Sequence, residues 1–168
     1  PIKNSYEALD LISKAVEENG YEDKIKFAID AAASEFYTGT QYQIEPGKLL
    51  NSDRLIEYYK DLVKKYPIVS LEDPFDQDDF DAYSELRKKL KIQIVGDDLL
   101  VTNPMRIEHA IKGKLCNCLL LKVNQIGTLT EALEAAKLAH KAKWEVMVSH
   151  RSGETEDTFI SDLAVALG

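Results

Sequence analysis

Five apolar runs of the chain each end on a polar side chain that could bind a metal ion or move a proton: Asp30, Glu72, Asp97, Lys122 and His150. In a parallel barrel the carboxyl ends of the strands meet at one face, so such residues can converge from distant parts of the sequence. Three convergent carboxylates offer the hard oxygen ligands that Mg²⁺ prefers, whereas without a cation they would repel one another and raise at least one pKa. The alternative, for each acid taken alone, is that it caps the following helix.

Lys122 would lie in the interior of such a barrel. An isolated buried charge is costly, so a purely structural lysine is disfavoured there. Nearby divalent cations would lower its pKa from the reference value of about 10.4 and make a neutral amine available as a proton acceptor. The alternative is a structural ion pair with one of the acids.

Residues 149–155 follow the last apolar run and are expected to open a helix. Arg151 offers a bidentate donor fork, and hydroxyl groups and helix N-terminal amides add further donors, which together suit a phosphate or a carboxylate. The alternative is a generic polar loop. His109 and His140 fall within predicted helices without a spaced metal-ligand partner, so we expect both at the surface.

The elements that must position these residues follow from an alternation of aliphatic runs and amphipathic stretches, which predicts βα units with parallel strands. We expect strands at residues 25–31, 68–73, 92–97, 116–123 and 145–150, helices at 5–18, 52–65, 80–90, 104–112, 129–141 and 155–167, and a loop or short hairpin at 38–51. Asn103 before Pro104, and the capping box of Thr128 and Glu131, mark two helix starts. The predicted fold class is α/β, a partial (β/α)8 TIM-type barrel of about five units, because a closed barrel takes about 250 residues.

Strand alternation assigns side chains to faces, since successive residues point to opposite sides. It places Lys122 and His150 on the inner face, with the residues that share their parity: Cys116, Cys118 and Leu120 for Lys122, and Val146 and Val148 for His150. Asp73 and Asp98 fall on the outward parity, and we expect them to act as caps or loop anchors.

Composition excludes several classes of function. A net charge of −8 without a basic stripe disfavours nucleic acid, and no apolar stretch approaches the roughly 20 residues that cross a bilayer. The start of the chain has no signal-peptide pattern, and we expect a cytoplasmic protein. Cys116 and Cys118 are too close for an ordinary disulfide and are expected to be reduced and buried.

Four motifs carry a resemblance to a known family. They are residues 70–79 (SLEDPFDQDD), 95–99 (VGDDL), 120–127 (LLKVNQIG) and 149–155 (SHRSGET). In this order they resemble enolase, phosphopyruvate hydratase, across essentially the whole chain, and the first motif is closer to eukaryotic than to bacterial enolases.

The resemblance implies Mg²⁺-dependent reversible dehydration of 2-phosphoglycerate to phosphoenolpyruvate, the enolase step of glycolysis and gluconeogenesis. It implies that Lys122 removes the proton from C2 of the substrate. The remaining implied roles are metal binding by Asp30, Glu72 and Asp97, and substrate binding by Glu72, Asp97, Ser149, His150, Arg151 and Ser152, with Arg151 and Ser152 at the phosphate.

Other family features are missing from these residues: the general-acid glutamate, a second lysine on the last barrel strand, and the N-terminal lid domain with its serine for a second Mg²⁺. We therefore expect residues 1–168 to form an incomplete enolase barrel domain that is inactive alone. Full-length members are usually homodimers. The alternatives are another enolase-superfamily enzyme, against which the phosphate-suited residues 149–155 argue, and a non-catalytic role such as plasminogen binding, for which residues 34–42 offer no lysine.

Overall fold

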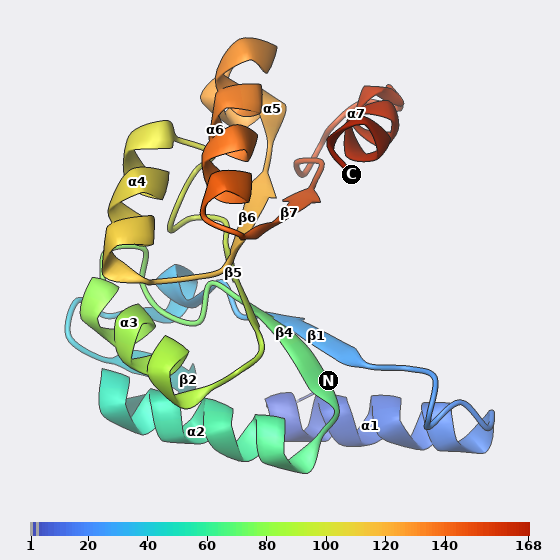
Figure 1. Cartoon of the computed structure of the whole chain (residues 1–168). Coiled ribbons are helices and arrows are strands. Elements are labelled where there is room, and N and C mark those ends of the chain that lie inside the picture. The colour runs from blue at the N-terminus through green and yellow to red at the C-terminus, as the bar shows by residue number, and fades with distance from the viewer. Residues whose placement is uncertain (1, 3) are drawn as a thin grey trace.

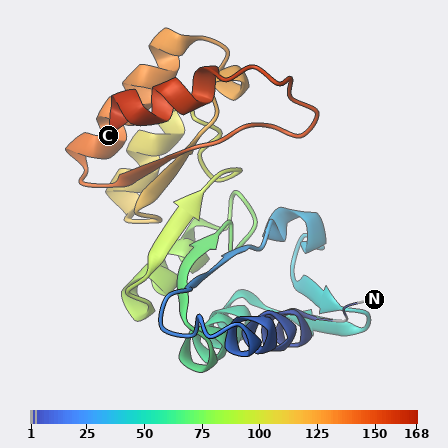
Figure 2. The ribbon, with the colours of Figure 1, turned by 90° about the vertical axis from the view of Figure 1, so that its right-hand side faces the viewer.

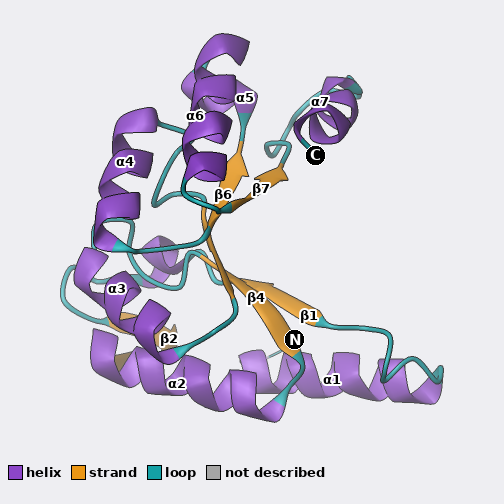
Figure 3. Ribbon diagram, in the orientation of Figure 1, coloured by secondary structure: helices purple, strands orange, loops and turns teal. Residues whose placement is uncertain are grey.

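A curved, five-stranded parallel sheet forms the centre of the computed structural model, which describes residue 2 and residues 4–168. The strand order is that of the chain: β1 (Phe27–Asp30), β4 (Ile68–Glu72), β5 (Gln93–Gly96), β6 (Cys118–Leu121) and β7 (Glu145–Val148). The sheet does not close on itself, and β1 and β7 are its two edges (Figures 1 and 3). This is the predicted architecture of part of a βα barrel.

Four helices cover the convex outer face of the sheet: α2 (Ser52–Lys65), α3 (Phe80–Lys89), α4 (Pro104–Gly113) and α6 (Leu129–Lys141). They lie side by side in chain order (Figure 1). The remaining helical segments are α1 (Ser5–Glu18), the short 3₁₀ helix η1 (Ala33–Phe36), α5 (Val123–Ile126) and α7 (Phe159–Leu167). Helix α1 packs against α2, where the rings of Tyr6 and Tyr58 meet at 5.6 Å (Figure 2).

The helix starts follow from side-chain caps. Asn103 accepts a hydrogen bond from the Met105 amide, with Pro104 in the first turn of α4. Thr128 accepts from the Glu131 amide at 3.2 Å, and its hydroxyl donates to the Glu131 carboxylate at 2.6 Å. Both caps are as predicted, and they satisfy amides that a helix start leaves unpaired.

The predicted last helix begins later than expected. Helix α7 starts at Phe159 instead of residue 155, and its N-cap residue Thr158 makes no side-chain capping bond. A long loop separates it from β7 (Figure 2). The polar residues 149–158 hydrogen-bond locally in turns, which compete with helix formation.

The two faces of β6 bury different clusters. Leu119 and Leu121 join the large core under the helices, while Cys118 and Leu120 pack with Val95 on the concave side. Lys122 follows with the inner parity, as predicted.

Two predictions of face next to β6 and on β7 were wrong. Cys116 belongs to the outer core, because regular alternation starts only at Cys118. On β7 the inner position is that of Met147, opposite Leu120, and the valines at 146 and 148 pack toward the helices.

Other predictions concern the periphery. The segment 38–51 contains an antiparallel hairpin, β2 (Tyr42–Glu45) and β3 (Lys48–Leu50). Both cysteines are free and buried, and His109 and His140 are exposed, as expected. None of the helices in the described part of the chain combines the length and apolar character that a bilayer span needs.

Candidate active site

An open cavity of about 680 Å³ lies at the carboxyl ends of the strands. It is lined by Asp30, Glu35, Glu72, Asp97, Asp98, Leu120, Lys122, Met147, Ser149, His150, Arg151 and Ser152. All eight predicted site residues are in this set, although their sequence positions span the chain from 30 to 152. A second, apolar hollow of about 230 Å³ beside α4 is separate and is lined by no acid or lysine.

Lys122 and Asp97 form the closest charged contact of the cavity. Lys122 Nζ lies 2.5 Å from Asp97 Oδ2, and each side chain is 15% exposed. The ion pair considered as the alternative role of Lys122 is therefore present. It also keeps the amine at the concave side of the sheet, between the ends of β5 and β6.

Glu72 is in an environment that disfavours its charged form. Burial first, and then the charges of Asp30 and Asp97, raise its pKa to about 7, while Lys122 opposes this. Asp97 Oδ1 is buried and has no hydrogen-bond partner among the described residues. An unpartnered carboxylate oxygen beside crowded acids is the arrangement that a divalent cation would complete.

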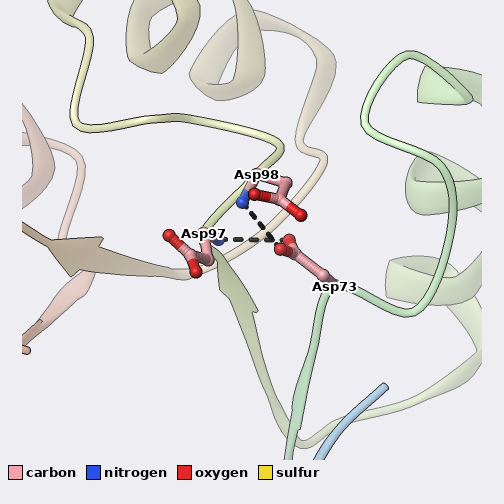
Figure 4. Close-up of side chains that lie close together, drawn as sticks. All are labelled: Asp73, Asp97 and Asp98. Carbon is pink, nitrogen blue, oxygen red and sulfur yellow. Dashed lines mark hydrogen bonds between the residues drawn. The ribbon is translucent and has the colours of Figure 1, made fainter. Parts of the chain in front are cut away.

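Asp73 serves a different purpose from its neighbour Glu72. Figure 4 shows its carboxylate facing two backbone amides, accepting from Asp97 at 3.1 Å and from Asp98 at 2.6 Å. The Tyr83 hydroxyl lies 3.2 Å from the same group, and Asp73 is 2% exposed. Asp73 is thus the predicted loop anchor, and it holds the turn that carries Asp97.

The predicted metal ligands do not form the tightest acidic group. Among the described residues, the group of three carboxylates that all come within 4.8 Å of one another is that of Asp73, Asp97 and Asp98. In Figure 4 the Asp97 carboxylate points away from Asp73, whose oxygens are already occupied by amides. Asp98, expected to face outward, lines the cavity instead because it lies beyond the last paired residue of β5.

The loop of residues 149–155 is held by its own hydrogen bonds. Glu154 accepts from the Arg151 amide at 2.5 Å and from the Asn124 side chain at 3.2 Å, which ties the loop to α5. The amides at the start of α7 are not part of this loop, contrary to the prediction, because the helix begins at Phe159. His150 lies past the end of β7, where regular alternation no longer applies. It therefore lines the cavity although Val146 and Val148, at alternate positions before it, pack toward the helices.

Sequence reasoning missed two features of the site. Glu35, from the 3₁₀ helix after β1, lines the cavity, but no motif singles it out. Thr102 is fully buried and contacts the main chain of Lys122 at 2.9 Å. Its only signal in sequence is its place between the Asp97 motif and the Asn103 cap.

Comparison with known proteins gives a consistent result. A family model described as the enolase C-terminal TIM barrel domain matches residues 1–168. An enolase of Methanocaldococcus jannaschii is 58% identical over 167 residues, which is 99% of this chain and 39% of that relative. The match confirms the predicted resemblance and the fold class, and the chain spans well under half of the relative's length.

Proposed function

The chain belongs to the enolase family, and on that premise we propose that it provides the base and the Mg²⁺ site for interconversion of 2-phosphoglycerate and phosphoenolpyruvate. The observation that supports this best is the convergence, in one cavity, of Lys122, three carboxylates and the loop of residues 149–155. We also propose that the protein is cytoplasmic and that the intact enzyme is a homodimer.

Lys122 is the proposed proton acceptor for C2 of 2-phosphoglycerate. A proton beside a carboxylate is weakly acidic, and its removal leaves a dianionic carboxylate that only concentrated positive charge can stabilise. The contact with Asp97, at 2.5 Å, holds the amine at the wall of the cavity. A lysine or histidine base combined with one or two Mg²⁺ ions is the established pattern of the enolase superfamily.

Asp30, Glu72 and Asp97 are the proposed metal ligands. The buried, unpartnered Asp97 Oδ1 and the raised pKa of Glu72 both fit a group that completes its environment with a cation. When bound, Mg²⁺ supplies positive charge beside the substrate carboxylate. It would also favour the ionised form of Glu72, whose proton must leave for the oxygen to become a ligand.

The proposed substrate contacts lie across the cavity. Arg151 and Ser152 are proposed to bind the phosphate, since a guanidinium fork matches phosphate oxygens bidentately and a hydroxyl adds a donor. Ser149 and His150 line the same side and are proposed to contact the substrate as well. Glu72 and Asp97 would face it from the opposite side.

A polypeptide of these 168 residues alone is proposed to have little or no turnover. The family's general acid, its second lysine and its lid domain are not among these residues, and groups that act as a unit lose most of their effect when one is missing. The base and the first metal site would therefore be present without the rest of the machinery.

The test compares two polypeptides. The first is the 168-residue chain, and the second is an intact chimera in which these residues replace the matching segment of the M. jannaschii enolase. Formation of phosphoenolpyruvate from 2-phosphoglycerate is followed with Mg²⁺ and with a chelator. Turnover by the intact chimera, abolished by chelation, supports the proposed function, and a folded but inactive chimera contradicts it. Turnover by the short chain at a similar rate contradicts its proposed inactivity.

A further inference from the structure

The main chain of Lys122 lies where β6 has lost its neighbour on one side. The paired residues of β5 and β6 end with Gly96 and Leu119, after which β5 turns into a loop. On the other side, pairing with β7 continues to Leu121, whose carbonyl accepts from the Ser149 amide. The Leu120 carbonyl and the Lys122 amide therefore need a partner that β5 no longer provides.

The hydroxyl of Thr102 provides both contacts. Its oxygen accepts from the Lys122 amide at 2.9 Å and lies 3.3 Å from the Leu120 carbonyl, to which it can donate. In a parallel sheet a strand residue donates to one carbonyl and accepts from the amide two residues later, so the hydroxyl reproduces the pairing of a missing β5 residue. Gln125 Oε1, also at 3.3 Å, is the other acceptor for the same hydrogen.

The backbone around Thr102 adopts a costly conformation. Val101 and Thr102 have φ of 45° and 54°, and β-branched residues rarely occupy the left-handed region. The Val101 amide donates to the Asp97 carbonyl at 2.7 Å, which closes the turn. Such strain persists where surrounding contacts fix it, and it concentrates at functional sites.

The same turn therefore holds Lys122 at two points. Its first residue, Asp97, contacts the ammonium group, and its last two residues place the Thr102 hydroxyl on the main chain. Thr102 is 0% exposed, so water does not compete for this contact.

We propose that Thr102 is a positioning residue for Lys122. Its hydroxyl extends the β5 side of the sheet by one hydrogen-bonded step and so fixes the main chain from which the Lys122 side chain projects. The proposal rests on the proposed role of Lys122 as base. Without the hydroxyl, the Lys122 amide loses its acceptor and the strand end can shift, and small displacements of a reacting group are costly in rate.

The test uses three variants of the intact chimera. Thr102→Val keeps the shape and removes the hydroxyl, whereas Thr102→Ser keeps the hydroxyl and removes the methyl group. Tyr66→Phe removes a partly buried hydroxyl that donates to Asp10 at 2.7 Å, just before the start of β4 and away from the cavity. We expect kcat of Thr102→Val to fall at least about tenfold with KM within about twofold, and kcat of Thr102→Ser and Tyr66→Phe to stay within about threefold. A Thr102→Val variant that keeps kcat, or a Ser variant that loses as much as Val, overturns the proposal.

Amide hydrogen exchange provides a readout that does not depend on turnover. We expect the Lys122 amide to exchange at least about tenfold faster in Thr102→Val than in the parent and Thr102→Ser. Unchanged exchange at Lys122 in Thr102→Val overturns the proposal, whether or not the parent chimera is active. A parent chimera that does not convert 2-phosphoglycerate counts against the proposed function alone. If Thr102→Val does not fold, Thr102→Ala replaces it, and the proposal requires Ala to lose kcat and Lys122 protection relative to Ser.

Discussion

The carboxylate side of the cavity and the loop of residues 149–155 face the same space but are held in different ways. On the first side, Lys122 and Asp97 are 15% exposed, and the turn after β5 is anchored by the buried Asp73. On the second side, residues 150–155 are all exposed. Glu154 accepts from the Arg151 amide within the loop and from Asn124, which ties the loop to α5. Packing fixes one side, whereas local hydrogen bonds shape the other.

The difference matches two kinds of demand on a site. Proton transfer and metal coordination depend on distances within a few tenths of an ångström, which buried strand ends can keep. Attraction of a phosphate by a guanidinium acts over several ångströms and tolerates movement. We therefore expect changes on the carboxylate side to reduce kcat or metal affinity, and changes in the loop to raise KM.

The largest expected effect is that of Lys122→Ala in the intact chimera. Loss of a general base typically costs 10²- to 10⁴-fold, so we expect kcat to fall about 10³-fold. Mg²⁺ affinity measured by calorimetry should be retained or tighter, because the ammonium that competes for Asp97 is gone. The exposed Lys137→Ala serves as control. A fall in kcat that is matched by loss of Mg²⁺ binding would place Lys122 in metal-site structure instead of proton transfer.

The second effect concerns Glu72 and pH. A carboxyl group with a pKa of about 7 is protonated below that value, so protons compete with Mg²⁺ on the acid side. We expect Mg²⁺ affinity of the intact chimera to rise from pH 6 to pH 8 and then level off.

Glu72→Gln should weaken Mg²⁺ binding at least about tenfold and flatten this pH dependence. The flattening is what assigns the pH dependence to Glu72 among the groups that line the cavity. Glu145→Gln, at the opposite end of β7, is the matched control. Equal affinity of the parent at pH 6 and pH 8 would contradict the prediction.

The same two sides differ in how far the sequence predicts them. Apolar runs that end on acids or lysine predict the strands and the cavity correctly. The signal is plainest for β5 and β6, which carry no exposed residue. The assignment of side chains to the two faces of the sheet is correct for Lys122 and wrong for Cys116, Val146 and Val148. For Cys116 the reason is that regular alternation holds only within the paired strand, which begins at Cys118.

Local conformation set the limit elsewhere. The start of α7 was placed four residues too early, because polar residues of the preceding loop hydrogen-bond among themselves. The contact of Thr102 with Lys122 depends on two residues with positive φ, and neither Val101 nor Thr102 is of a type that predicts this conformation. Tertiary contacts that override local preference leave little trace in one sequence.

A third, smaller effect is expected for Arg151→Lys. The substitution keeps the positive charge and removes the planar fork, so we expect KM for 2-phosphoglycerate to rise about tenfold with kcat within about threefold. The surface change Arg54→Lys is the control. A fall in kcat at unchanged KM would mean that Arg151 acts on the transition state more than on binding. The expected difference, in which the carboxylate side affects kcat and the loop affects KM, would then be wrong.

The smallest effect, and the sharpest test of how the loop is held, is that of Glu154→Gln. The amide can keep one of the two contacts of Glu154, either with the Arg151 amide or with Asn124, but it removes a negative charge beside the proposed phosphate site. If the contacts matter, the loop loosens, and KM should rise about threefold with faster exchange of amides 149–155.

If only charge matters, loss of a repulsive carboxylate should lower KM, most clearly at low salt. The direction of the change in KM thus separates the two causes. Glu156 is exposed and lies two residues away. Glu156→Gln also removes one negative charge but leaves the contacts of Glu154 with Arg151 and Asn124 in place, so it measures the electrostatic effect on KM alone. A KM that falls equally in both variants would mean that Glu154 acts through its charge and does not anchor the loop.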